Sequence, residues 1–361
     1  MKKIILLLFS LIFLIASCAP GSTEPQTLTV MTHDSFAVSE DVVKSFEDAN
    51  SAKVVFLQSG DAGSVLNKAI LTKDAPLADV LFGVDNTFLS RALEADIFEA
   101  YVSPRLADIP DAFKLDSSNR ALPVDYGDVC INYDKGYFAD NSLAVPQSLE
   151  DLTQPEYANL LVAENPATSS TGLAFLLATV AHFGEDGYLD FWRDLKDNGV
   201  VIVDGWETAY YTNFSASSGR GPQPMVVSYG TSPAAEVIFS ETALDDAPTA
   251  SILGPDTCFR QIEFVGILKG TQKRDLAEKF VDFMLSKEFQ EDIPIQMFVY
   301  PVNSNTELPE EFLQYAQASE QTAALSPDEI ASNRDRWIPS WTEVVIKYNA
   351  LALIKAHICW Q

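Results

Sequence analysis

The sequence has few basic residues, with 24 Lys and Arg against 51 Asp and Glu and a formal net charge of -27. This negative charge argues against nucleic acids and anionic lipids as partners and suits a cationic ligand better. Histidine and cysteine are scarce as well, and neither a CxxC motif nor a His/Cys cluster is present, so we predict no metal site. The GxSxG, HExxH and P-loop motifs of common hydrolases, metalloproteases and nucleotide-binding enzymes are also absent.

The amino terminus has no apolar run long enough to cross a membrane, which needs about 20 residues. Two lysines precede a shorter apolar run at positions 4–16, which is typical of an export signal. The run leads into Ile15-Ala16-Ser17-Cys18, which resembles a bacterial lipobox. We therefore expect a lipoprotein signal peptide at 1–17, a lipid attachment on Cys18 that anchors the protein to the extracytoplasmic side of the membrane, and a flexible tether at 18–26. An ordinary secretory signal with an unrelated Cys18 is the alternative.

Short β-prone runs alternate with amphipathic helices in the remaining chain, which predicts an α/β protein with parallel sheets. Ligands of such sheets bind at the carboxyl ends of the strands, here the turns at 33–36, 59–64 and 85–86. About 340 residues exceed what one hydrophobic core usually supports, so we expect two lobes. Their predicted bounds are 27–123 plus 257–345 for lobe 1 and 124–256 for lobe 2, and 346–361 is a tail of unknown role.

Two cysteines remain once Cys18 is assigned to the anchor and Cys359 to the tail. An oxidising compartment allows a disulfide between Cys130 and Cys258, although their spacing alone does not establish the pair. If each cysteine lies just past a crossing between the lobes, the bond holds two hinge segments side by side.

Several turns carry a family resemblance that runs from about Leu28 to Val345. These segments are Thr32-His33-Asp34-Ser35-Phe36, Val124-Asp125-Tyr126-Gly127, Pro166 to Gly172, Gly205-Trp206, Ser228 to Ala234 and Tyr300-Pro301-Val302. In order and spacing they resemble the periplasmic thiamine-binding proteins of ABC transporters. The resemblance implies a type II periplasmic-binding-protein fold in which two lobes, each a mainly parallel sheet flanked by helices, enclose a ligand cleft. It further implies a monomer that needs no cofactor and delivers thiamine, thiamine monophosphate or thiamine diphosphate to ABC permease and ATPase subunits.

The resemblance also implies a set of ligand contacts. Carried over by position, the phosphate-side contacts are Asp61, Ala62, Thr168, Ser169, Trp206, Tyr229 and Ser232. Ser64 and Thr171 each stand at the opening of a predicted helix, where free amide groups favour an anion. Each such turn is equally well explained as an ordinary helix N-cap.

A cationic thiazolium favours aromatic faces and carboxylates. The candidate faces are Trp206, Tyr210, Tyr126 and Tyr229, and the candidate carboxylates are Asp34, Asp85 and Asp125. Further contacts are expected from His33, Ser35, Phe298 and Tyr300. Packing in the core is the alternative explanation for any single aromatic residue.

The chain departs from the family pattern at three aromatic positions. His33 and Ala235 stand where the pattern has tyrosine, and Phe298 stands where it has tryptophan. Ferric iron, held by Tyr210 and Tyr211 with His33 and aspartates, and a polyamine therefore stay open as alternative ligands. Two functions outside solute binding also stay open: an exported enzyme that uses His33 or His182 as an acid or base, and a purely structural surface lipoprotein.

Overall fold

The computed structural model describes residues 25–216 and 221–347. The predicted signal peptide, Cys18, most of the tether and the tail beyond residue 347 lie outside these ranges. Within the described residues, no helix has both the length and the apolar character that a membrane crossing requires.

The strands form a single curled, mixed sheet. They are β1 (Gln26–Thr32), β2 (Ala52–Gln58), β3 (Val80–Asp85), β4 (Phe98–Glu99), β5 (Leu122–Asp134), β6 (Leu161–Glu164), β7 (Val201–Val203), β8 (Met225–Tyr229), β9 (Thr249–Ile252), β10 (Phe259–Leu268) and β11 (Tyr300–Pro301). Hydrogen-bonded neighbours follow the order β2-β1-β3-β10-β5-β8-β6-β7. β1 pairs in parallel with β2 and β3, and β6 pairs in parallel with β7 and β8.

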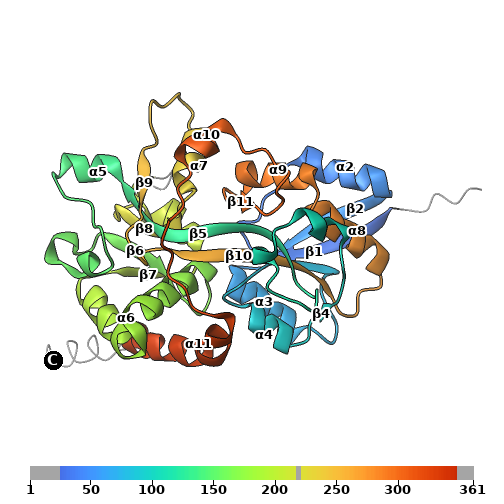
Figure 1. Ribbon diagram of the computed structural model, residues 1–361, viewed down its shortest axis with the longest axis horizontal. Helices are drawn as coiled ribbons and strands as arrows, with labels where there is room; N and C mark the ends of the chain where they lie inside the picture. The colour runs from blue at the N-terminus through green and yellow to red at the C-terminus, as the bar shows by residue number, and fades with distance from the viewer. Residues whose placement is uncertain (1–24, 217–220, 348–361) are drawn as a thin grey trace, which may run out of the picture.

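Two long strands connect the halves of the molecule. β10 pairs antiparallel with β3 and β5, and β5 continues into antiparallel pairs with β8 and β9. In Figure 1 both strands run across the middle of the view between the part built on β1 to β3 and the part built on β6 to β8. This arrangement confirms the two-lobed α/β fold, with a parallel group of strands in each lobe and antiparallel crossing strands between them.

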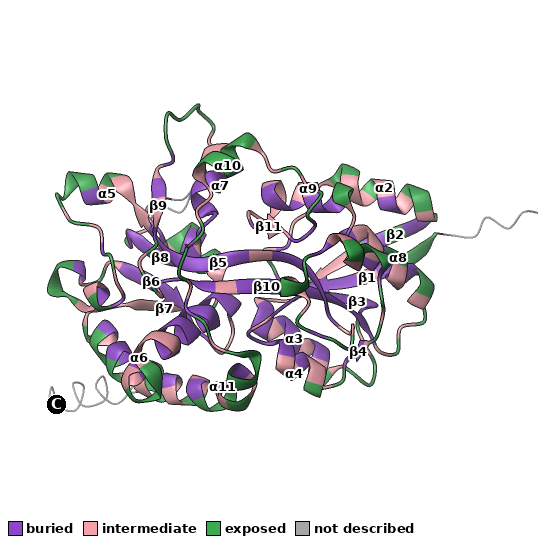
Figure 2. Ribbon diagram, viewed as in Figure 1, coloured by how far each residue is buried: buried purple, intermediate pink, exposed green. Residues whose placement is uncertain are grey.

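Helices cover the outer faces of the sheet. They are α2 (Glu40–Asn50), α3 (Ala62–Leu71), α4 (Leu89–Glu94), α5 (Lys135–Asp140), α6 (Ser170–Asp197), α7 (Ser232–Ile238), α8 (Arg274–Met284), α9 (Lys287–Gln296), α10 (Glu310–Tyr315) and α11 (Pro327–Thr342). Amphipathic helices pack through their apolar face: α8 buries Leu276, Phe280 and Met284, four residues apart, against the β1 side of the core. Figure 2 shows the central strands buried and the exposed residues on the outer helices.

The C-terminal helices lie against both lobes. α11 packs against α6 of the second lobe, where the rings of Trp341 and Trp192 meet edge to face at 5.4 Å, and α10 packs against α7. At its other end, α11 reaches the first lobe, because the buried Arg334 donates to the carbonyl oxygen of Thr87 and to Ser90 Oγ, both at 3.3 Å. The segment 310–342 therefore contacts both lobes. The apolar side chains of α11 pack on α6 of the second lobe, and Arg334 binds the first lobe.

The predicted disulfide between Cys130 and Cys258 is confirmed, with the two Cα atoms 4.3 Å apart. Cys130 lies within β5 and Cys258 directly precedes β10, in the region where Val129 pairs with Phe259. The bond therefore ties the two crossing strands together.

Candidate functional site

The strand ends of the two lobes face each other across a cavity of about 870 Å3. The first lobe contributes the turns after β1 and β2, and the second contributes those after β7 and β8. A much smaller cavity adjoins it and shares His33, Trp206 and Tyr229. The predicted contacts that line these cavities are His33, Asp34, Ser35, Asp61, Ala62, Trp206, Tyr210, Tyr229, Ser232 and Phe298.

Asp61 connects the two lobes. Its carboxylate accepts hydrogen bonds from the backbone N–H of Ala62 at 2.7 Å and, across the cleft, from those of Ser170 at 3.3 Å and Trp206 at 3.1 Å. Ser170 opens α6, where free amide groups and the helix dipole favour a negative charge. Burial raises the pKa of Asp61, and the hydrogen bonds from Trp206 and Ala62 oppose that rise. The Asp61 carboxylate thus accepts hydrogen bonds from backbone amide groups, at Trp206 and at the start of α6, in the region where the sequence predicts a phosphate.

The lobes also touch at the start of α3. The backbone N–H of Gly63 donates to the carbonyl oxygen of Thr168 at 3.2 Å, and a Cβ on Gly63 would lie 2.9 Å from that oxygen. Only glycine allows this approach without a shift. Together with the bonds of Asp61, the contact shows the two lobes closed on each other.

Four aromatic rings gather on the side of the second lobe. The ring of Trp206 stacks on that of Tyr210 at 5.0 Å and 19°, and it meets those of Tyr211 and Tyr229 at 5.4 and 6.5 Å. Ser228 fixes the indole, because Trp206 Nε1 donates to its Oγ at 2.8 Å. The four rings line the cavity and offer faces that bind a flat or cationic group.

An ion pair lies at the base of the cavity in the first lobe. His33 Nε2 lies 3.4 Å from Glu263 Oε1, and His33 Nδ1 lies 3.0 Å from Ser35 Oγ. Burial is the largest single influence and opposes the charged imidazolium, but the charge and hydrogen bond of Glu263, together with the charges of Asp61 and Asp34, outweigh it and raise the pKa of His33. Gly83 makes room for the ring, since its φ is +98° and a Cβ there would lie 2.3 Å from His33 Cδ2.

Glu263 is one of three buried carboxyl residues on neighbouring strands. In the strand register Glu263 lies opposite Asp125 on β5 and opposite Asp85 on β3, so the three residues lie side by side. Burial, followed by the charge of Glu263, raises the pKa of Asp125 well above its ordinary value. Asp125 therefore holds its proton to a higher pH than an exposed aspartate does.

The cavity wall is acidic. Asp34, Glu207, Glu236, Glu241 and Glu263 line it, and no lysine or arginine among residues 25–216 and 221–347 does so. Such a lining attracts a positively charged ligand. Across the same stretch of chain, no three His, Cys, Asp or Glu side chains are grouped so as to hold a metal ion.

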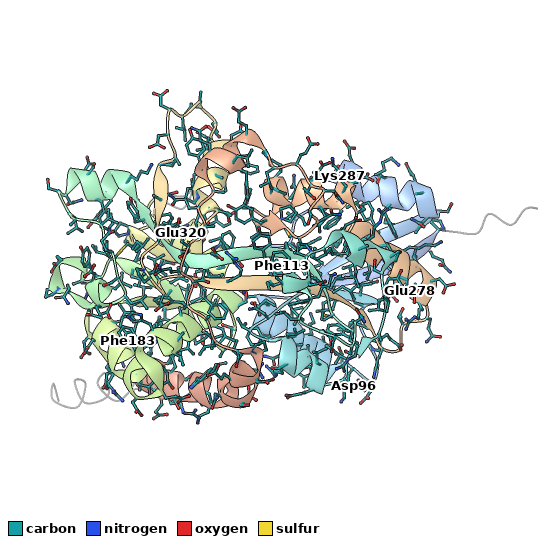
Figure 3. All side chains as sticks on the ribbon, viewed as in Figure 1. Asp96, Phe113, Phe183, Glu278, Lys287 and Glu320 are labelled. Carbon is teal, nitrogen blue, oxygen red and sulfur yellow. A yellow bond between two sulfur atoms is a disulfide. The ribbon has the colours of Figure 1, made fainter. Side chains whose placement is uncertain are left out.

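Several predicted contacts lie away from both cavities. They are Ser64, Asp85, Asp125, Tyr126, Thr168, Ser169 and Tyr300. The ring of Tyr126 is already covered by protein groups, since it stacks with Tyr300 at 5.3 Å and with Phe113 at 4.6 Å. Figure 3 shows Phe113 beside the crossing strands. Arg260 lies 5.6 Å over the same ring.

Three other polar members of this set bind protein groups, and one of them, Ser169, hydrogen-bonds the Asp61 carboxylate across the cleft. Asp85 is fully buried and accepts from Thr87 and from the backbone N–H of Phe88 at the start of α4. Thr168 Oγ1 donates to the carbonyl oxygen of Asp204 at 2.7 Å, and Ser169 Oγ lies 3.0 Å from Thr171 Oγ1. In this structure these side chains therefore do not line either cavity.

Sequence reasoning missed several cavity residues, among them Glu207, Glu236, Phe239 and Glu263. A signal existed for two of them. Glu236 and Phe239 stand four and seven residues after Ser232, so they lie on the same helical face as this predicted contact. Glu263 gave no such signal, because its position opposite Asp125 depends on the register of two distant strands.

Residues 75–331, more than half of the chain, match the family of bacterial extracellular solute-binding proteins. The thiamine-binding periplasmic protein of Brucella suis is 30% identical over 348 residues, which cover 94% of this chain and 98% of that relative. Its counterpart in Salmonella typhimurium is 30% identical over 337 residues, with 92% and 97% coverage.

Solved structures give the same result. A periplasmic thiamin binding protein has a TM-score of 0.79 and 29% identity, over 90% of this chain and 98% of its own. A ferric binding protein from Campylobacter jejuni, with a TM-score of 0.68 and 18% identity, shares the fold alone. The chain belongs to the bacterial extracellular solute-binding protein family, and it is an extracytoplasmic binding protein and not an enzyme.

Proposed function

We propose that the protein binds thiamine or its phosphates between its two lobes and delivers the ligand to an ABC permease driven by a separate ATPase. The observation that carries this proposal is a cavity that combines the rings of Trp206, Tyr210 and Tyr229 with an acidic wall. Thiamine is a flat cation with two rings, and a desolvated cation–π contact contributes about 2 kcal/mol. The relatives named for thiamine binding support the same ligand.

Binding proceeds by closure of the lobes in this proposal. The crossing strands β5 and β10 carry the hinge, and ligand contacts from both lobes favour the closed form. The protein acts as a monomer, and the lipid on Cys18 and the tether keep it at the membrane near the permease. Incorporation of labelled palmitate into the wild-type protein, and its loss in Cys18→Ser, is the expected result for the anchor.

Isothermal calorimetry on protein freed of copurified ligand tests the proposal. The panel contains thiamine, its mono- and diphosphates, ferric iron and a polyamine. Saturable binding of at least one thiamine form is expected, whereas binding of iron or the polyamine alone overturns the assignment. The affinities of thiamine and of its phosphates are then compared. Tighter binding of a phosphate form indicates that the phosphate replaces Asp61 as the acceptor of the N–H groups of Ser170 and Trp206.

Removal of one ring tests the site itself. Trp206→Ala should weaken thiamine binding by at least tenfold, or about 1.4 kcal/mol, because the indole stacks beside the cavity. An unchanged affinity would show that thiamine, if bound, lies elsewhere.

A further inference from the structure

One face of α7 forms part of the cavity wall. Ser232, Ala235, Glu236 and Phe239 stand at spacings of three and four residues, and all of them line the cavity. Phe239 directly follows the last helical residue, so its side chain continues this face. The face therefore presents a hydroxyl, a methyl group, a carboxylate and an aromatic ring in succession.

Phe239 is unusual among these side chains because it is 59% exposed although it is large and apolar. Its ring meets that of Phe298 edge to face, with centroids 5.0 Å apart and planes at 79°. Phe239 lines the cavity and keeps most of its surface uncovered by protein despite this contact. An apolar ring exposed inside a binding cleft marks a contact that a ligand completes.

The backbone at Phe298 supports the same interpretation. Its φ is +59°, in the left-handed region that bulky residues rarely adopt. The hydroxyl of Thr231, one residue before α7, donates to the carbonyl oxygen of Phe298 and holds this conformation. A hydrogen bond therefore fixes the Phe298 backbone to the start of α7, whose far end carries Phe239.

Ala235 also lines the cavity, four residues before Phe239 on the same helical face, and its side chain is only a methyl group. A small residue at this point leaves space beside the rings. On the same helical face, the Glu236 carboxylate accepts from the Tyr210 hydroxyl at 2.6 Å, so a carboxylate and a phenol border that space. The space fits a neutral aromatic ring better than an ion, because rings cover one side and a methyl group another.

We propose that Phe239 is a ligand-contacting residue and forms, with Phe298, the wall against which the neutral ring of the ligand packs. For thiamine this ring is the aminopyrimidine, while Trp206 and the acidic residues hold the cationic ring. This inference rests on the proposed function and refines it by assigning the two rings to different walls. Phe239, one helical turn after Ala235, then supplies the aromatic contact that Ala235 lacks.

Calorimetry with thiamine on four proteins tests the inference: wild type, Phe239→Ala, Phe239→Tyr and the control Leu71→Ala. Leu71 is 86% exposed at the end of α3 and does not line the cavity. Phe239→Ala should weaken binding by about tenfold or more, because it removes the ring contact. Phe239→Tyr should bind within about threefold of wild type, and Leu71→Ala should match wild type. Thermal midpoints without ligand should agree for all four proteins, since both substituted side chains are exposed.

The outcomes separate the two proposals. If wild type does not bind any thiamine form, the proposed function fails and the inference fails with it. If wild type binds thiamine and Phe239→Ala binds it equally well, the inference alone is overturned. A weak Phe239→Tyr variant would also overturn it, because a retained ring should retain the contact.

Discussion

Asp61 is the residue whose removal should separate lobe closure from ligand contact most clearly. Replacement by asparagine keeps the size of the side chain but leaves one acceptor oxygen and introduces an N–H donor. At least one of the two bonds across the cleft, to Ser170 or Trp206, is then lost. Both bonds exist only while the lobes are together, so the loss falls on the closed form.

A hydrogen bond to a charged acceptor contributes about 1.5–3 kcal/mol. The low end applies here, because the bond from Ser170 is long at 3.3 Å and burial of the Asp61 carboxylate opposes its charge. A loss of about 2 kcal/mol corresponds to a closed form populated about 30-fold less relative to the open form. If the ligand binds only the closed form and the open form predominates without ligand, the affinity falls by the same factor.

Two measurements check this prediction. Calorimetry should give the 30-fold loss for Asp61→Asn and none for Asp74→Asn, an exposed control with the same charge change. Small-angle X-ray scattering without ligand should give Asp61→Asn a radius of gyration no smaller than that of wild type. Wild-type affinity in Asp61→Asn would refute the reasoning, since the cross-cleft bonds would then contribute nothing to closure.

Three further perturbations follow from the structure. Burial raises the pKa of Asp85 to about 6, so the folded form holds the proton more tightly than the unfolded form. The free energy of unfolding should therefore fall by about 3 kcal/mol as pH rises from about 4 to about 6. Urea unfolding of Asp85→Asn should lack this fall, and the same pH dependence in Asp85→Asn and wild type would contradict the prediction. Replacement of Cys130 and Cys258 by serine removes a link across 128 residues and should lower the free energy of unfolding by about 5 kcal/mol. Urea unfolding measures this loss, and an unchanged midpoint would contradict it. Gly63→Ala places a methyl group 2.9 Å from the carbonyl oxygen of Thr168, so calorimetry should show weaker ligand binding with little change in the thermal midpoint without ligand.

Local sequence patterns predict the strands and the cleft well. The runs at 28–32, 53–57 and 225–228 all lie within strands, because buried parallel strands are continuous apolar segments with turn residues at their ends. The turns at their carboxyl ends do line the cleft, which follows from the geometry of any parallel sheet. Such features depend on neighbours in sequence.

Features that depend on register or on distant packing are not visible in the sequence. Tyr126 resembles a ligand contact until Phe113 and Tyr300 are found stacked with it. Asp85 is similar, since its partners include Gln261 on a strand far along the chain. The apolar positions of α11 are evident, but not that α6 of the second lobe provides the surface they need.

Arg334 gives α11 a part in setting the resting position of the lobes. The tryptophans of α11 are buried beside α6, so the helix stays with the second lobe, whereas the guanidinium is lodged beside α4 of the first. Separation of the lobes breaks the hydrogen bonds from the guanidinium to Thr87 and Ser90 and withdraws it from the ring of Phe88, 5.9 Å away. Arg334 is therefore a second tie between the lobes besides Asp61, and both ties have to be released before the cleft can open.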